Sequence, residues 1–285
     1  LLISVGKTLQ VDVQNICLFL NRLDATQRWT PAIAYTNYTL YNAMLALDLG
    51  KVQSILDYAF QLSMRKDHYP SSLDILSFGH ADWNKPACDE HLCSYKRETG
   101  FMGHINSPKA DVWRVNSEAA AVAIGLIEEA HPEMYDQMSS IVSKVTLFDG
   151  KGYSGISGTN MFGDLALRVS PKELDPVLHF CDHIAHECSH YYLHGIMASD
   201  PLILNPPEER YSSPLRADMR PMFGIYHATF VLTQMSLTFE RLIETGCNQT
   251  HFVEAWKDMK SKQSEALQVV FQHGMLTDEG RLLAE

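Results

Sequence analysis

The sequence contains no cluster of basic residues. Its 23 Lys and Arg residues are scattered among 34 Asp and Glu residues, which gives a formal net charge of -11. Because nucleic-acid binding requires a concentrated basic face, a nucleic-acid partner is not expected. A basic substrate would suit this charge better than an acidic one.

Long apolar runs and closely spaced cysteines are also missing. No run approaches the ~20 apolar residues that a membrane-spanning helix needs. The first residues show neither the charged region nor the cleavage site of a signal peptide. The six cysteines are spread along 285 residues, unlike those of a small disulfide-rich domain. We therefore expect no membrane partner and a reducing, cytoplasmic location.

Hydrophobic residues make up 46% of the chain and charged residues 20%, which is typical of a globular protein with a sizeable core. We see no internal repeat and no convincing linker, so we predict a single catalytic domain over 1–285. Its pattern has three parts. They are a helical N-terminal part (1–65), a long irregular segment (66–115), and a core with C-terminal helices (116–285).

Helical patterns dominate the chain. Thr30 as N-cap and Pro31 at the first helical position predict a helix that runs to Gly50, and residues 51–64 repeat the apolar spacing. From 65 to 115 this periodicity disappears, and segments of that length are usually functional or mobile.

Helices and a few strands are expected again after this segment. Asn116 or Ser117 caps the next predicted helix, and Pro132 begins another. Two strand-like runs, KVTLFD and TNMFGDLALRVS, are joined by the glycine-rich GKGYSGISG, which lacks the Lys-Ser/Thr ending of a phosphate-binding loop. The predicted fold class is α+β and predominantly helical, with a small β-hairpin or sheet before the helix described next.

The segment HIAHECSHYYLHG, residues 183–195, contains the pattern His-Glu-x-x-His. Its helix starts either with Ser170 as N-cap and Pro171 at the first position, or with Asp175 and Pro176 in those roles. His186 and His190 are four residues apart, so they lie on one helix face and can bind a single cation. Glu187 can face the outer coordination sphere of that cation. Two further histidines share the stripe, His183 and His194.

A third metal ligand has to come from elsewhere in the chain. Leu193 and Ile196 occupy the positions where the metzincin pattern requires Gly and His, so that subclass is excluded. A glutamate could serve instead, the candidates being Glu208 and Glu209 in a loop-like segment, and Glu240. His227 is the stronger candidate, because it lies on the apolar stripe of a helix predicted between Pro221 and Gly246. Gly224, about one turn earlier, would let the backbone approach another helix or a ligand.

Three segments in this order resemble a known family: YSGISGTNMFGDLALRVS, then HIAHECSHYYLH, then YSSPLRADMRPMFGIYHATFV. The family is the HExxH-motif proteins of peptide-modification gene clusters, which are 2-oxoglutarate-dependent iron peptide β-hydroxylases. The resemblance covers roughly residues 115–245, and its most specific part is YSSPLRADMRPMFGIYHATF. The N-terminal third and the final helix carry no recognisable motif.

This resemblance implies Fe(II) bound by His186, His190 and His227, with 2-oxoglutarate and dioxygen as co-substrates. Three protein ligands leave three octahedral positions, two for the 2-oxo acid and one for dioxygen. Arg216 and Arg220 are candidates to bind the second carboxylate of 2-oxoglutarate, since a guanidinium group pairs well with a carboxylate. The expected reaction hydroxylates an unactivated carbon, Cβ of a residue in a peptide or of a related amino-acid substrate.

Glu187 has a different role in each hypothesis. In the hydroxylase no general base is needed, so Glu187 would orient a ligand or the substrate. The alternative is a zinc metallopeptidase in which Glu187 deprotonates metal-bound water. A third hypothesis is a metal-stabilised binding module that recognises a partner through its long irregular segment.

Weaker candidates complete the set. Cys88, His91 and Cys93 resemble zinc ligands, but no second cysteine pair lies nearby. Tyr211 and Ser212 could line the pocket. The sequence does not indicate the oligomeric state.

Overall fold

The computed structural model describes residues 30–63, 73–80, 84–100, 103–213, 215–247 and 249–285. The chain divides into two compact units, one of Leu1–Trp113 and Ser139–Val169 and the other of Arg114–Met138 and Ser170–Glu285. The boundaries between them fall inside α6 (Ala110–Ala130) and α7 (Pro132–Ile141). The single catalytic domain predicted over 1–285 remains a prediction.

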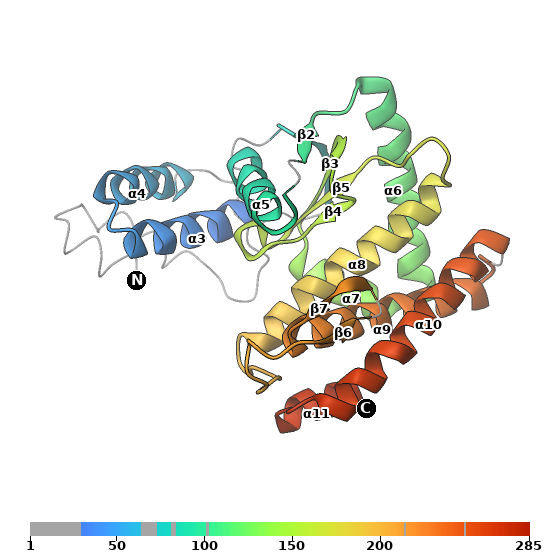
Figure 1. The fold of residues 1–285 in the computed structure, drawn as a ribbon. Coiled ribbons are helices and arrows are strands. Elements are labelled where there is room, and N and C mark those ends of the chain that lie inside the picture. Colours follow the sequence, from blue (N-terminus) through green and yellow to red (C-terminus); the bar gives the residue numbers. More distant parts are fainter. Residues whose placement is uncertain (1–29, 64–72, 81–83, 101–102, 214, 248) are drawn as a thin grey trace. The chain divides into compact units, whose positions relative to one another are not determined.

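The first unit contains a five-stranded mixed sheet (Figure 1). Parallel pairing joins β1 (Asp74–Ser77) to β3 (Lys144–Lys151) and β3 to β5 (Asp164–Arg168). Two short strands pair antiparallel, β2 (His104–Asn106) with β3 and β4 (Gly155–Ile156) with β5. The two predicted strands are therefore parallel neighbours rather than a hairpin, because the glycine-rich connection carries the chain back along β4. The second, predicted over 159–170, is a strand only at Asp164–Arg168, since Thr159–Met161 form a 3-10 helix.

The helices of the first unit are α3 (Pro31–Leu45), α4 (Leu49–Ser63), α5 (Asn84–Thr99) and the short 3-10 helix η1 (Thr159–Met161). Thr30 is the N-cap of α3 and Pro31 its first residue, as predicted. Gly50 does not end this helix, since it already lies in the first turn of α4. Side chains from α3, α5, η1, the strands and the residue after β1 form one core: Ala32, Ile33, Phe78, Ala87, Cys88, Phe148, Ile156, Met161 and Ala166.

The segment 66–115 is not irregular where the structure describes it. It contains β1, α5 and β2 as well as the start of α6. The sequence pattern did not predict α5, because few of its described side chains are buried and the apolar periodicity is therefore weak; the buried ones include Ala87, Cys88 and Leu92. Pro86 looks like a helix breaker, but it lies in the first turn, where a missing N–H costs no hydrogen bond.

The start of α6 also differs from the prediction. This helix begins at Ala110, six residues before the predicted cap at Asn116. Asn116 is buried inside the helix, and its Oδ1 accepts a hydrogen bond from the backbone N–H of Ser170 at 2.7 Å. The side chain that resembled a helix cap therefore fixes a distant loop. α7 begins at Pro132, as predicted.

The second unit is built around three long helices that lie side by side, α8 (Pro176–Met197), α9 (Met222–Glu244) and α10 (Thr250–His273) (Figure 1). It also contains the short helix α11 (Asp278–Ala284) and a two-stranded antiparallel sheet of β6 (Tyr211–Ser213) and β7 (Arg216–Arg220). The helices share a core of Leu193, Leu202, Met222, Ile225, Tyr226, Phe230 and Val270.

The predicted fold class, α+β and predominantly helical with a small sheet before α8, is confirmed. No helix among the described residues is long and apolar enough to cross a membrane. The cysteines that the structure describes, five of the six, are all free.

Candidate metal centre

The helix that carries the His-Glu-x-x-His pattern begins at the second of its two predicted starts. Asp175 is the N-cap, and its Oδ1 accepts hydrogen bonds from Val177 N at 2.8 Å and Leu178 N at 3.1 Å. Pro176 is the first helical residue. A start at Ser170 is wrong because Pro176 would then lie inside the helix, where its ring clashes with the preceding turn.

The helix that carries His227 runs beside α8. Pro221, predicted at the first helical position, is instead the N-cap, so the helix begins one residue later, at Met222. Gly246 follows its end with φ +118°. In this left-handed conformation glycine is favoured, so the predicted terminator is confirmed. His227 lies in the second turn of α9 and faces α8.

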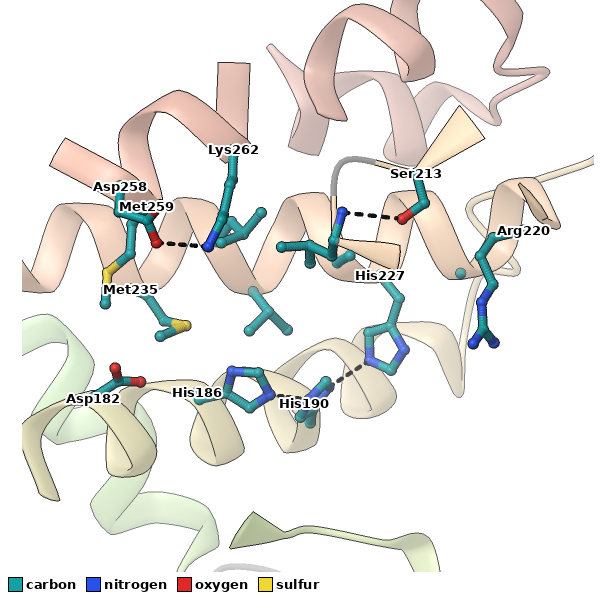
Figure 2. A pocket seen from close by; sticks show the side chains of 15 residues that line it. Asp182, His186, His190, Ser213, Arg220, His227, Met235, Asp258, Met259 and Lys262 are labelled. Atoms are coloured by element: carbon teal, nitrogen blue, oxygen red, sulfur yellow. Dashed lines mark hydrogen bonds and ion pairs between the residues drawn. The ribbon is translucent and has the colours of Figure 1, made fainter. Parts of the chain in front are cut away.

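Three histidines from these two helices are in contact (Figure 2). His190 Nε2 lies 3.0 Å from His186 Nε2, and His190 Nδ1 lies 2.9 Å from His227 Nε2. The neighbouring rings meet nearly edge to face, with centroids 4.7 Å and 4.6 Å apart. All three residues proposed as metal ligands are therefore brought together.

The three histidines line a cavity of about 430 Å³. Four elements form its walls: α8, α9, α10 and the β6–β7 hairpin. In Figure 2 the histidines form a row along α8 and α9, with Asp182 at one end and Arg220 at the other. The remaining lining residues are Ser213, Leu215, Gly224, Ala228, Val231, Leu232, Met235, Asp258, Met259 and Lys262.

Burial keeps these imidazoles neutral. Desolvation lowers the pKa of His186 and of His227 to about 4, and neighbouring histidines lower it further in the same direction. The pKa of His190 lies well below its ordinary value, first through desolvation and then through His186, His227 and His194. At neutral pH each ring therefore has one nitrogen lone pair, which is the form that binds a metal.

The rings do not all point at one position. His190 directs one nitrogen to His186 and the other to His227, so the three cannot share a cation without one ring turning. Within the described residues, no group of three or more His, Cys, Asp or Glu side chains is arranged to hold a metal ion. The three histidines suit a metal by residue type, charge state and proximity, but their nitrogens do not point at a common position.

The glutamates of the peptidase hypothesis are not among the described residues that line the cavity. Glu187 is buried, with 6% of its surface exposed, and is not among the described residues that line the cavity. Neither Glu208, Glu209 nor Glu240 is among them. Glu209 accepts a hydrogen bond from Tyr211 at the surface.

The two predicted arginines both lie on β7. Arg220 lines the cavity, and its Nε forms an ion pair with Asp218 Oδ2 at 2.9 Å without hydrogen-bond geometry. The structure describes the backbone of Arg216 but not its side chain, so its predicted role stays a prediction.

Other candidates from the sequence do not reach the cavity. His183 Nδ1 bonds to the backbone carbonyl of His179 at 2.8 Å, and His194 only approaches His227, with ring centroids 5.2 Å apart. In place of Tyr211 and Ser212, the next residue, Ser213, lines the cavity.

The cysteine and histidine group of α5 does not form a metal site. Cys88 is fully buried and Cys93 is exposed, so they point in different directions. His91 Nε2 instead pairs with Asn160 Oδ1 at 2.8 Å. This contact ties α5 to η1 in the first unit.

Sequence patterns did not predict the charged residues at the end of the cavity opposite Arg220. These are Asp182 on α8, and Asp258 and Lys262 on α10. Asp182 is one turn before His186, which is the only local sign that it shares the metal-facing stripe.

No protein-family model matches this sequence, and no curated protein matches it. The likeness to the peptide β-hydroxylases therefore rests on the sequence motifs alone.

Proposed function

We propose that this chain is an Fe(II)- and 2-oxoglutarate-dependent dioxygenase. It would hydroxylate an unactivated carbon, Cβ of a residue in a peptide or of a related amino-acid substrate, and release succinate and carbon dioxide. The observation that carries the proposal is the contact of His186, His190 and His227 on one wall of a cavity that Arg220 also lines.

The donor set supports iron(II). Two nitrogen ligands at a right angle on one metal lie about 3.0 Å apart, given metal–nitrogen bonds of about 2.1 Å. The contact of 3.0 Å between His186 Nε2 and His190 Nε2 matches that separation, whereas the ring of His190 would have to turn for His227 to share the same ion, because it meets His227 with its other nitrogen. Three imidazoles with no carboxylate are a variant of the two-histidine, one-carboxylate triad of iron oxygenases. When bound, iron(II) and a chelated 2-oxo acid activate dioxygen for insertion into a C–H bond.

The other cavity residues have clear roles under this proposal. Arg220 binds the distal carboxylate of 2-oxoglutarate next to His227. Val231, Leu232 and Met235 line the cavity and are all buried, so they exclude water from the carbon that reacts. Glu187 supports the motif helix from within the core, since it is buried and makes an interaction inside the fold.

The zinc metallopeptidase has less support. A general base must lie within hydrogen-bond reach of the water that it deprotonates. Glu187 is not among the described residues of the cavity wall, and the three candidate glutamate ligands are not there either.

Spectroscopy of the anaerobic protein tests the proposal. With Fe(II) and 2-oxoglutarate, the protein should develop the weak visible charge-transfer band of a chelated 2-oxo acid. His227→Ala should abolish the band. His194→Ala should retain it, because His194 lies one turn beyond His190 on the same helix but outside the cavity wall. A band that survives in His227→Ala shows that the third ligand is wrong. Peptide cleavage with zinc and without dioxygen rules out the hydroxylase.

A further inference from the structure

Asp182 is a carboxylate that faces the cavity without a contact partner (Figure 2). Among the described residues it forms no hydrogen bond and no ion pair, although His179 and Lys262 attract it at longer range. Desolvation raises its pKa to about 6, so at neutral pH it is mostly an ionised group in poorly solvated surroundings. A partly buried charge of this kind is costly unless a ligand or a side chain of opposite charge compensates it.

The nearest cation of the cavity wall is already paired. Lys262 Nζ lies 2.6 Å from Asp258 Oδ2, one turn earlier on α10. This end of the cavity therefore carries two carboxylates and one ammonium group. The other end carries Arg220 and His227. A ligand that fills the cavity thus meets negative charge at the Asp182 end and positive charge at the Arg220 end.

Part of the cavity wall is apolar, and Met235 and Met259 lie on the Asp182 side of it in Figure 2. Leu232, Met235 and Met259 line the cavity, and each is at most 6% exposed. Along α8, Asp182 precedes His186 by one turn, about 6 Å of helix rise. A chain of methylene groups with a cation at its end matches this arrangement, because the stem can pack on the apolar wall while the charge reaches Asp182.

We infer that Asp182 binds an alkylammonium or guanidinium group of the substrate, which places an aliphatic carbon beside His186. The inference rests on the proposed function, since it takes the histidines to be the reacting end of the cavity. The substrate is therefore an amino acid that presents a cation, either the basic side chain of a residue in a peptide or the α-ammonium group of a free amino acid. The net charge of -11 favours the approach of such a cation.

Calorimetric titration of the metal-free protein tests this inference. Three probes separate the sources of charge: acetyl-Gly-Lys-Gly-amide, the same peptide with norleucine in place of lysine, and free norleucine. At least one charged probe should bind about tenfold or more tightly than the uncharged norleucine peptide. A preference for the lysine peptide identifies a side-chain cation, and a preference for free norleucine identifies an α-ammonium group.

Variants show whether Asp182 causes the preference. Asp182→Asn should remove it, and Glu254→Gln, at an exposed acid on α10 that is not part of the cavity wall, should leave it unchanged. Lys262→Met should strengthen the preference, because it removes the competing cation and releases Asp258. Thermal unfolding checks that each variant is folded.

Two outcomes overturn the inference. One is equal binding of all three probes by the unaltered protein, and the other is a preference that persists in Asp182→Asn. The charge-transfer band of the iron-loaded protein is measured separately on the same variants. A missing band with an Asp182-dependent preference contradicts the proposed reaction and not the cation site.

Discussion

His190 Nδ1 lies 2.9 Å from His227 Nε2, although 37 residues separate the two histidines in the sequence. The other nitrogen of His190 lies 3.0 Å from His186. A neutral imidazole has one donor and one acceptor nitrogen, so His190 donates to one neighbour and accepts from the other. Both contacts depend on this one ring. The row of histidines is therefore coupled, and a ligand that turns His190 also changes the partners of His186 and His227.

Glu187→Gln should have little effect on the proposed reaction. Glu187 is buried and is not among the described residues that line the cavity. The charge-transfer band of the variant should therefore persist, and the affinity of the variant for 2-oxoglutarate should change less than tenfold. A general base contributes about 10²–10⁴ in rate, so a peptidase would lose at least a hundredfold. Zinc-dependent peptide cleavage that this substitution abolishes would establish the alternative. Thermal unfolding controls for loss of the buried contacts of Glu187.

Arg220→Lys should weaken binding of 2-oxoglutarate by about ten- to a hundredfold, the range for one hydrogen bond to a charged group. Lysine keeps the charge but loses the two-pronged geometry of the guanidinium group. Binding of 2-oxobutyrate, which lacks the distal carboxylate, should not change. Affinities come from titration of the charge-transfer band, with Arg216→Lys for comparison. If Arg216→Lys shows the selective loss instead, the carboxylate ligand is Arg216.

Local sequence patterns predicted the histidine cluster well. The start of α8 follows from Asp175 and Pro176, and the shared face of His186 and His190 follows from helix geometry. These features depend only on residues within one helix. His227 could be chosen because its own helix begins at a proline and ends at a glycine.

The rest of the site depends on how the helices pack. Nothing within α10 indicates that Lys262 and Asp258 border a cavity, because that depends on the neighbouring helices α8 and α9. Asp182 was missed for the same reason. A polar residue on a helix is expected to face solvent unless it is known which element packs against that face. The ring directions of His190 are likewise set by contacts across two helices.

Gly224→Ala tests whether the small residue serves the cavity or the packing of α9. A Cβ there would meet only ordinary contacts, 3.9 Å from Arg220 Cβ and 4.0 Å from Pro221 Cδ. The close helix approach suggested by the sequence therefore does not need this glycine. We expect the free energy of unfolding to rise by about 0.5 kcal/mol, since alanine restricts the unfolded chain. Gly224→Phe should fill part of the cavity and weaken binding of 2-oxoglutarate.

Urea unfolding of both variants measures the stability, and titration of the charge-transfer band measures the binding. If Gly224→Ala is less stable than the unaltered protein, the contacts around this position are tighter than the structure indicates. If Gly224→Phe binds 2-oxoglutarate normally, the co-substrate does not occupy this part of the cavity.

Asp164 should make the stability of the first unit depend on pH. Its side chain is fully buried in β5, and Thr146 Oγ1 donates a hydrogen bond to its Oδ2 at 2.9 Å. Desolvation raises the pKa to about 7, and the Thr146 hydrogen bond and Lys144 only partly oppose this rise. In the unfolded chain an aspartate has a pKa of about 3.9. Between about pH 3.9 and pH 7, the folded state therefore retains a proton that the unfolded state has already released.

The sign of the effect follows from this difference. Because the folded state binds more protons, the contribution of Asp164 to stability is complete below about pH 4 and is lost as the pH rises through 7. One proton gives a slope of at most about 1.4 kcal/mol per pH unit. Asp164→Asn cannot ionise, so its free energy of unfolding should fall less between pH 5 and pH 8 than that of the unaltered protein. Urea unfolding at both pH values measures the difference. Asp149→Asn, at an exposed position in β3, is the control and should keep the original slope. If Asp164→Asn also keeps that slope, the carboxyl group is ionised in the folded protein and another group causes the pH dependence.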